Sequence, residues 1–153
     1  MDLILWRHAE AEEEHEEVDD LERALTPRGE KQAARLAAWL DRHLPEGTRV
    51  ISSPARRCEQ TVLPLGRKYK LKETLAPGAT PSDVLEAAQW PVAKQAVLVV
   101  GHQPALGETV AQLLGIQGGQ CAVRKGAVWW LRTRERDGQE QTVLWAVQGP
   151  ETT

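Results

Sequence analysis

The sequence predicts an α/β sandwich with a mostly parallel central sheet and an antiparallel edge. Three observations support this fold class. Short apolar segments alternate with helical patterns along most of the chain. Residues 96–100 are continuously apolar and rich in β-branched side chains, which is typical of a strand buried on both faces. Two strand-like segments close the chain, with Asp137-Gly138, a hairpin turn sequence, between them.

The first elements follow from local signals. Residues 3–6 form an apolar run of strand length. Thr26-Pro27 predicts a helix start, because threonine caps helices and proline suits the first turn. Pro45 and Gly47 end that helix, and a second strand follows at residues 50–53. The apolar face of the helix has i, i+3, i+4, i+7 spacing and consists of Ala33, Leu36, Ala37, Leu40 and Leu44.

The second half repeats the alternation. Residues 55–63 have a helical pattern that Pro64 and Gly66 interrupt. Thr80-Pro81 begins another helix, which should close before Pro91. After the buried strand at residues 96–100, a helix should begin at Pro104 and end at Gly115. Strands are expected at residues 127–132 and 142–147.

Length and composition indicate one folded domain over residues 1–153. Hydrophobic residues make up 41% and charged residues 27%, which excludes disorder, collagen and a coiled coil for the whole chain. No apolar run approaches the ~18 residues of a membrane span, so we expect no membrane partner. The two cysteines, Cys58 and Cys121, form no CxxC pair, and we expect a reduced, cytoplasmic protein.

The net charge of −3 is unevenly distributed. Residues 10–22 contain nine of the 22 acidic residues and no lysine or arginine, which leaves 13 acidic against 19 basic residues elsewhere. This acidic segment is interpreted either as a solvated loop or as the border of a basic site that screens incoming ligands. We expect no nucleic-acid partner.

Histidine and arginine side chains stand at the ends of three predicted strands. Arg7-His8 follows the first strand, Arg56 and Arg57 follow the second, and His102 follows the buried strand. If these strands are parallel, the residues meet where open α/β sheets bind ligands. No carboxylate stands at matching positions, so we expect no metal and no other cofactor. Guanidinium groups suit phosphoryl oxygens, and imidazole can attack phosphorus as a nucleophile.

The motifs containing these residues resemble the histidine phosphatase superfamily, which has the phosphoglycerate mutase-like fold. Arg7-His8-Ala9-Glu10 resembles its RHG[ED] signature, and residues 25–29 (LTPRG) match LTxxG. Residues 52–61 (SSPARRCEQT) match SSPxxRAxQT with Arg57 at the motif arginine, and residues 101–104 (GHQP) match GHxP. The short chain most resembles the small bacterial phosphohistidine phosphatases of the SixA type, as does the stretch from Asp20 to Thr26 (DLERALT).

The resemblance implies a three-layer sandwich and a set of site residues. Arg7, His8, Arg57 and His102 are the expected catalytic residues, and Arg7, Arg57 and His102 would also bind the phosphoryl group. Asp20 is expected to bind substrate by orienting or protonating the leaving group; alternatively, it only caps a helix or pairs with an arginine. His15, His43 and Arg56 are interpreted as surface residues, and Cys58 as a packing residue.

Two departures from the family pattern bear on function. Ala9 replaces the usual glycine, which indicates that position 9 needs no positive φ. Residues 75–81 (LAPGATP) contain no carboxylate, although mutases and broad phosphomonoesterases of the family carry an acidic residue there. An alkoxide needs such an acid to leave, whereas a protonated imidazole does not.

We therefore expect dephosphorylation of phosphohistidine on a protein such as a histidine phosphotransfer domain. Two alternatives stay open. One is a phosphomonoesterase acting on a small phosphorylated metabolite, with an acid not yet located. The other is a non-catalytic phosphate-binding module.

Overall fold

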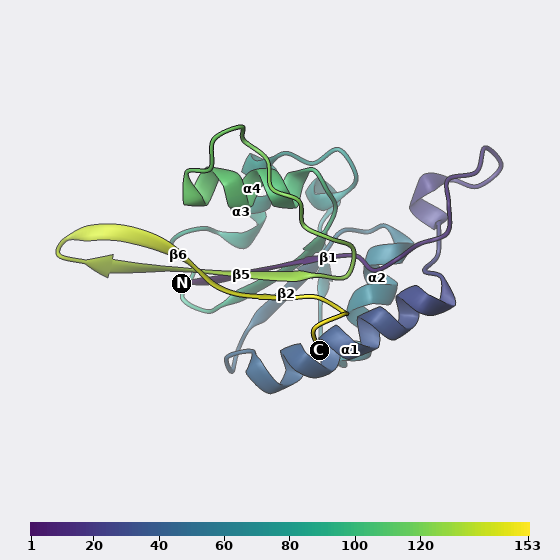
Figure 1. The fold of residues 1–153 in the computed structure, drawn as a ribbon, viewed down its shortest axis with the longest axis horizontal. Coiled ribbons are helices and arrows are strands. Elements are labelled where there is room, and N and C mark those ends of the chain that lie inside the picture. Colours follow the sequence, from purple (N-terminus) through teal and green to yellow (C-terminus); the bar gives the residue numbers. More distant parts are fainter.

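A computed structural model describes all residues, 1–153, and its centre is one six-stranded sheet in the order β3-β2-β4-β1-β5-β6 (Figure 1). The strands are β1 (Asp2–Arg7), β2 (Arg49–Ser52), β3 (Lys70–Leu71), β4 (Val97–Gly101), β5 (Val128–Arg136) and β6 (Gln139–Gln148). β4 pairs in parallel with β1 and β2, and β2 pairs in parallel with β3. β5 is antiparallel to β1 and β6, so the predicted mixed sheet is confirmed.

Four α-helices cover the sheet in two layers (Figure 1). α1 (Pro27–His43) and α2 (Arg56–Val62) lie on one face, and α3 (Pro81–Ala88) and α4 (Ala105–Leu114) on the other. Short 3₁₀ turns occupy Asp20–Glu22 (η1), Leu63–Leu65 (η2) and Glu73–Leu75 (η3). The expected three-layer sandwich is therefore present.

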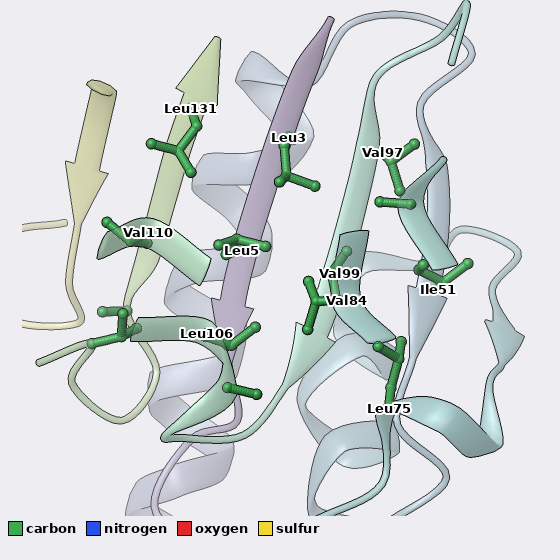
Figure 2. Packing of buried hydrophobic residues seen from close by; sticks show 14 residues of the cluster. Leu3, Leu5, Ile51, Leu75, Val84, Val97, Val99, Leu106, Val110 and Leu131 are labelled. Atoms are coloured by element: carbon green, nitrogen blue, oxygen red, sulfur yellow. The ribbon is translucent and has the colours of Figure 1, made fainter. Parts of the chain in front are cut away.

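Alternating residues of β1 serve two separate cores. Leu3 and Leu5 face the α3–α4 layer, where they pack with Leu106 and Val110 (Figure 2). The other face of β1 packs Ile4 and Trp6 against the α1–α2 layer. Burial on both faces explains why β1 and β4 are apolar throughout rather than alternating.

Helix boundaries follow the predicted signals. Thr26 Oγ1 accepts a hydrogen bond from the Gly29 amide and caps α1. Thr80 and Asp83 form a reciprocal capping box at α3, and Gly115 ends α4 in the left-handed conformation. α3 ends at Ala88, before Pro91, because Gln89 has a φ of 57°.

Two features differ from the sequence expectation. β3 has only two residues, both exposed, so it carried no apolar signal. The final hairpin is longer than expected, because β5 and β6 remain paired beyond the apolar residues. Asp137 and Gly138 both have positive φ and form its predicted turn. None of the helices is long and apolar enough to cross a membrane.

Candidate active site

Parallel pairing brings the predicted site residues to one edge of the sheet. Arg7 at the end of β1 is opposite Gly101 at the end of β4, and Ser52 of β2 is opposite Val100. The rings of His8 and His102 are 5.3 Å apart between centroids. One guanidinium nitrogen of Arg57 lies 3.5 Å from His102 Nδ1.

The chain holds His8 in one tautomer. Its Nδ1 lies 2.7 Å from the Ala9 carbonyl oxygen, which can only accept, so Nδ1 carries the hydrogen. Nε2 then has a free lone pair. Burial, together with the positive charges of Arg57 and Arg7, lowers the pKa of His8 to about 3, although the Ala9 hydrogen bond opposes the shift. His8 is therefore neutral at physiological pH and suited to nucleophilic attack.

Thr61 links the histidine strand to the arginine helix. Its hydroxyl accepts a hydrogen bond from the Ala9 amide at 3.0 Å and donates one to the Arg57 carbonyl at 2.7 Å. Thr61 is fully buried, so neither bond is exchanged with water. The side chain therefore fixes the peptide that orients His8. Ala9 has no positive φ, as its replacement of glycine predicted.

Arg57 is buried and bonded to Asp20. Its two terminal nitrogens donate to the Asp20 carbonyl oxygen at 2.7 Å and to Oδ2 at 3.1 Å. Arg23 donates to Asp20 Oδ1 at 2.9 Å. Desolvation raises the pKa of Asp20, but the hydrogen bonds and charges of Arg23 and Arg57 outweigh it and lower the pKa below its usual value. Asp20 thus pairs with arginines, as one interpretation expected, and is ionised at neutral pH.

His102 is oriented by Ser53, whose role the sequence did not indicate. Arg57 can only donate to His102 Nδ1, so Nε2 carries the hydrogen and donates to Ser53 Oγ at 2.8 Å. Burial and the charge of Arg57 lower the pKa of His102 to about 4, although Asp20 opposes the shift. In this tautomer Nδ1 is an acceptor, so His102 donates to a phosphoryl oxygen only after taking up a proton.

Arg7 lies close enough to His8 and His102 that, beyond the effect of burial, its charge lowers the pKa of both rings. One of its terminal nitrogens donates to the Val123 carbonyl oxygen at 3.0 Å, which fixes the direction of the side chain. The Nε atoms of Arg7 and Arg57 are buried and have no partner within the protein. Neither Nε atom is open to solvent, so contacts with a ligand must use the terminal nitrogens of the two guanidinium groups.

Two clefts of opposite character flank the cluster. A cleft of about 370 Å³ is lined by part of the acidic segment, including Asp20, and by Arg23. A second cleft, of about 300 Å³, is lined mainly by basic residues, including Arg7. Residues 12–19 are exposed, as a solvated loop would be, yet Asp20 joins the acidic segment to Arg57. A larger cavity of about 720 Å³, lined by residues between Ser82 and Gln95, lies at the opposite end of β4.

Four further residues lie at the surface or in the core, as the sequence predicted. His15, His43 and Arg56 are exposed, and Cys58 is completely buried. No group of three or more His, Cys, Asp or Glu side chains is arranged to hold a metal ion.

The glycine of LTxxG and the residue at the variable position of GHxP both have structural roles. A Cβ atom at Gly29 would lie 2.0 Å from the Glu10 carbonyl oxygen, so only glycine lets α1 approach the histidine loop. Gln103 donates to the Cys121 carbonyl oxygen and accepts from the Gly107 amide, which ties the start of α4 to the loop before β5.

The chain is similar to known proteins of one superfamily. Residues 3–78 match the model of the histidine phosphatase superfamily, branch 1. The chain is 32% identical over 132 residues to a phosphohistidine phosphatase SixA homolog from Haemophilus influenzae, covering 75% of this chain and 78% of the relative.

Solved structures match over almost the whole chain. A structure named phosphohistidine phosphatase SixA from Nakamurella multipartitia has a TM-score of 0.80 and 30% identity, covering 97% of this chain and 95% of that one. The protein histidine phosphatase SixA complexed with tungstate has a TM-score of 0.76 and 24% identity, covering 98% and 97%. The second likeness concerns the fold alone.

Proposed function

Because the chain belongs to the histidine phosphatase superfamily and is a phosphatase of the histidine-nucleophile type, we propose that it removes the phosphoryl group from phosphohistidine on a protein. The reaction proceeds through a phosphorylated His8. The observation that carries this proposal is the neutral His8 ring, whose Nδ1–H is bonded to the Ala9 carbonyl beside Arg57 and His102.

In the first step, the lone pair of His8 Nε2 attacks phosphorus and forms an N–P bond. The bond between phosphorus and the substrate nitrogen breaks, and its electron pair stays on the departing imidazole. The His8 ring now carries a positive charge, which the Ala9 carbonyl stabilises through Nδ1–H. In the second step, a water oxygen attacks phosphorus and the bond between phosphorus and His8 Nε2 breaks, with its electron pair returning to Nε2. The protons of the water leave with the phosphate or pass to solvent, and neutral His8 is restored.

Arg7, Arg57 and His102 bind the phosphoryl oxygens. The arginines supply fixed positive charge in a largely buried site, where electrostatic stabilisation of the transition state is strong. His102 contributes a donor at Nδ1 once the bound phosphoryl dianion has raised its pKa and it has taken up a proton. Ser53 keeps the ring oriented through Nε2–H.

The substrate class follows from the properties of Asp20. The lowered pKa keeps this carboxylate ionised, so it cannot protonate an alkoxide leaving group. An ionised carboxylate can instead accept a hydrogen bond from a protonated imidazole. The Asp20 side chain is 43% exposed and therefore reachable by a substrate ring. This arrangement favours a phosphoramidate over a sugar phosphate, and a histidine phosphotransfer domain is the corresponding protein partner.

The second candidate is hydrolysis of a small phosphorylated metabolite. The basic cleft beside Arg7 favours it, because that cleft provides additional positive charge for a small anion. A non-catalytic binding module is less consistent with His8, whose free Nε2 and neutral ring suit attack rather than only binding.

Kinetics on two substrate classes test the proposal. We expect kcat/KM on a phosphohistidine-bearing phosphotransfer protein to exceed that on any of a panel of phosphorylated metabolites by at least about tenfold. Asp20→Asn should lower kcat/KM on the phosphotransfer protein about tenfold, because the variant loses a partly solvated hydrogen bond between a charged carboxylate and the substrate ring. Glu22→Gln, in the same 3₁₀ turn, is the matched control. Higher activity on a metabolite, or equal effects of both variants, would contradict the proposal.

A further inference from the structure

A basic groove extends from Arg7 along the start of α1. The cleft of about 300 Å³ beside Arg7 shares Arg28, Gln32 and Glu151 with a neighbouring cleft of about 190 Å³. The two clefts adjoin between α1, the turn before β5 and the C-terminal residues, and together they are called the basic groove. Its basic residues are Arg7, Arg28, Lys31, Arg35, Arg124 and Lys125.

Positive charge in this basic groove is poorly compensated. Its acidic residues are Glu10 and Glu151, and each forms only a long ion pair, with 3.9 Å between nitrogen and oxygen. Glu10 pairs with Arg28 and Glu151 pairs with Arg124. Glu10 also accepts a hydrogen bond from the Thr26 hydroxyl at 2.7 Å, so its charge is shared with the cap of α1. The ion pairs of the protein do not include Lys31, Arg35 or Lys125.

Two of these basic residues, Arg28 and Lys31, stand at the start of α1, where the helix dipole repels positive charge. Glu30 in the same turn offsets part of this repulsion. An anion in the groove would relieve this repulsion. Gln32 uses its side-chain oxygen to accept from the Glu10 amide, which leaves its amide nitrogen available as a further donor.

We propose that the basic groove is a second anion-binding subsite, which takes a phosphate or carboxylate group carried by the same substrate. The proposal rests on the proposed function only in that the first anionic group is the phosphoryl group at His8. Arg7 belongs to both sites and joins them. Apart from Glu10, which lines the groove, the acidic segment lies on the Asp20 side, so the second anionic group is expected to extend toward α1.

Calorimetric titration with orthophosphate and with linear tripolyphosphate tests the subsite. The unmodified protein should bind tripolyphosphate at least about tenfold more tightly than orthophosphate. The double variant Arg28→Gln/Lys125→Gln should weaken tripolyphosphate binding about tenfold and change orthophosphate binding less than twofold. Arg42→Gln/Lys94→Gln removes the same charge from exposed sites outside the groove and should leave both affinities unchanged.

Three results would overturn the proposal: no preference for tripolyphosphate, equal weakening of both ligands, or equal weakening by the control variant. A second comparison identifies the source of the anion. The comparison uses a phosphohistidine peptide with flanking glutamates and the same peptide with glutamines. If the glutamate peptide is hydrolysed faster, and Arg28→Gln/Lys125→Gln removes the difference, the second anionic group is a carboxylate. If only tripolyphosphate shows a preference, the second anionic group is a phosphate. Calorimetry needs no turnover, so failure of phosphohistidine hydrolysis would leave the subsite result intact.

Discussion

Lowering the pH should not inactivate His8 until the solution becomes strongly acidic. The pKa of His8 is about 3 because burial and the nearby arginines disfavour its protonated form. At pH 5 a histidine with the ordinary pKa of about 6.5 is only about 3% neutral, whereas one with a pKa of about 3 is about 99% neutral. The difference in nucleophile concentration is therefore about thirtyfold, with the perturbed His8 the more active.

Ring-nitrogen NMR provides the direct assay. Spectra of ¹⁵N-labelled protein should show His8 neutral and protonated at Nδ1 from pH 8 to pH 5, with His8→Gln identifying its signals. Single-turnover phosphorylation rates over the same range should follow the neutral fraction after correction for ionisation of the substrate. A His8 midpoint near 6.5, or a neutral ring protonated at Nε2, would refute the reasoning.

The same titrations affect stability, with a defined sign. Unfolded histidines take up protons near pH 6.5, whereas folded His8 and His102 do so only near 3 and 4. The unfolded state therefore binds more protons in this interval. The free energy of unfolding should fall as pH decreases from 6.5, by up to about 1.4 kcal/mol per pH unit for each histidine. Circular dichroism at each pH shows whether the protein stays folded during the NMR titration.

Four further outcomes are expected. His8→Ala should leave less than roughly 1% of phosphatase activity, because it removes the nucleophile, while calorimetry should still detect phosphate binding through the arginines; higher residual turnover would argue against His8. Thr61→Val should lower the free energy of unfolding in urea by about 1–3 kcal/mol, because the buried Ala9 amide loses its acceptor, and an unchanged urea midpoint would contradict that role. EDTA should leave activity unchanged, since guanidinium groups supply the positive charge; inhibition reversed by Mg²⁺ or Zn²⁺ would refute this. Replacing Glu12, Glu13 and Glu14 of the acidic segment by glutamine should raise kcat/KM for a small dianionic phosphate. The gain should shrink with added salt, because the Debye length falls to ~8 Å at physiological ionic strength. A gain that does not depend on salt, or no gain, would leave the acidic segment a simple solvated loop.

Local signals predicted most of the fold because each was strong. The apolar run at residues 96–100 and the Thr26-Pro27 and Thr80-Pro81 starts correspond to β4, α1 and α3. β3 could not be predicted, because two exposed residues carry no periodicity and pair only through their position beside β2.

The site was partly predictable for a similar reason. Histidine and arginine at strand ends, within recognisable motifs, indicated which side chains would meet. Their hydrogen-bond partners depend on tertiary geometry instead. The bonds of Ser53 to His102 and of Thr61 to the Ala9 amide join residues about 50 positions apart. The groove beside Arg7 likewise combines α1 with the loop before β5 and the C-terminal residues, which no local pattern connects.

Trapping the phosphorylated enzyme tests the central claim most directly. The protein is mixed with a phosphohistidine-bearing phosphotransfer protein, quenched in alkali within milliseconds and analysed by mass spectrometry under conditions that preserve phosphohistidine. We predict a phosphoryl group on His8 that forms and decays at rates matching turnover, and that is absent from His8→Ala. Turnover without a phosphorylated His8, or a phosphoryl group on another residue, would contradict the account.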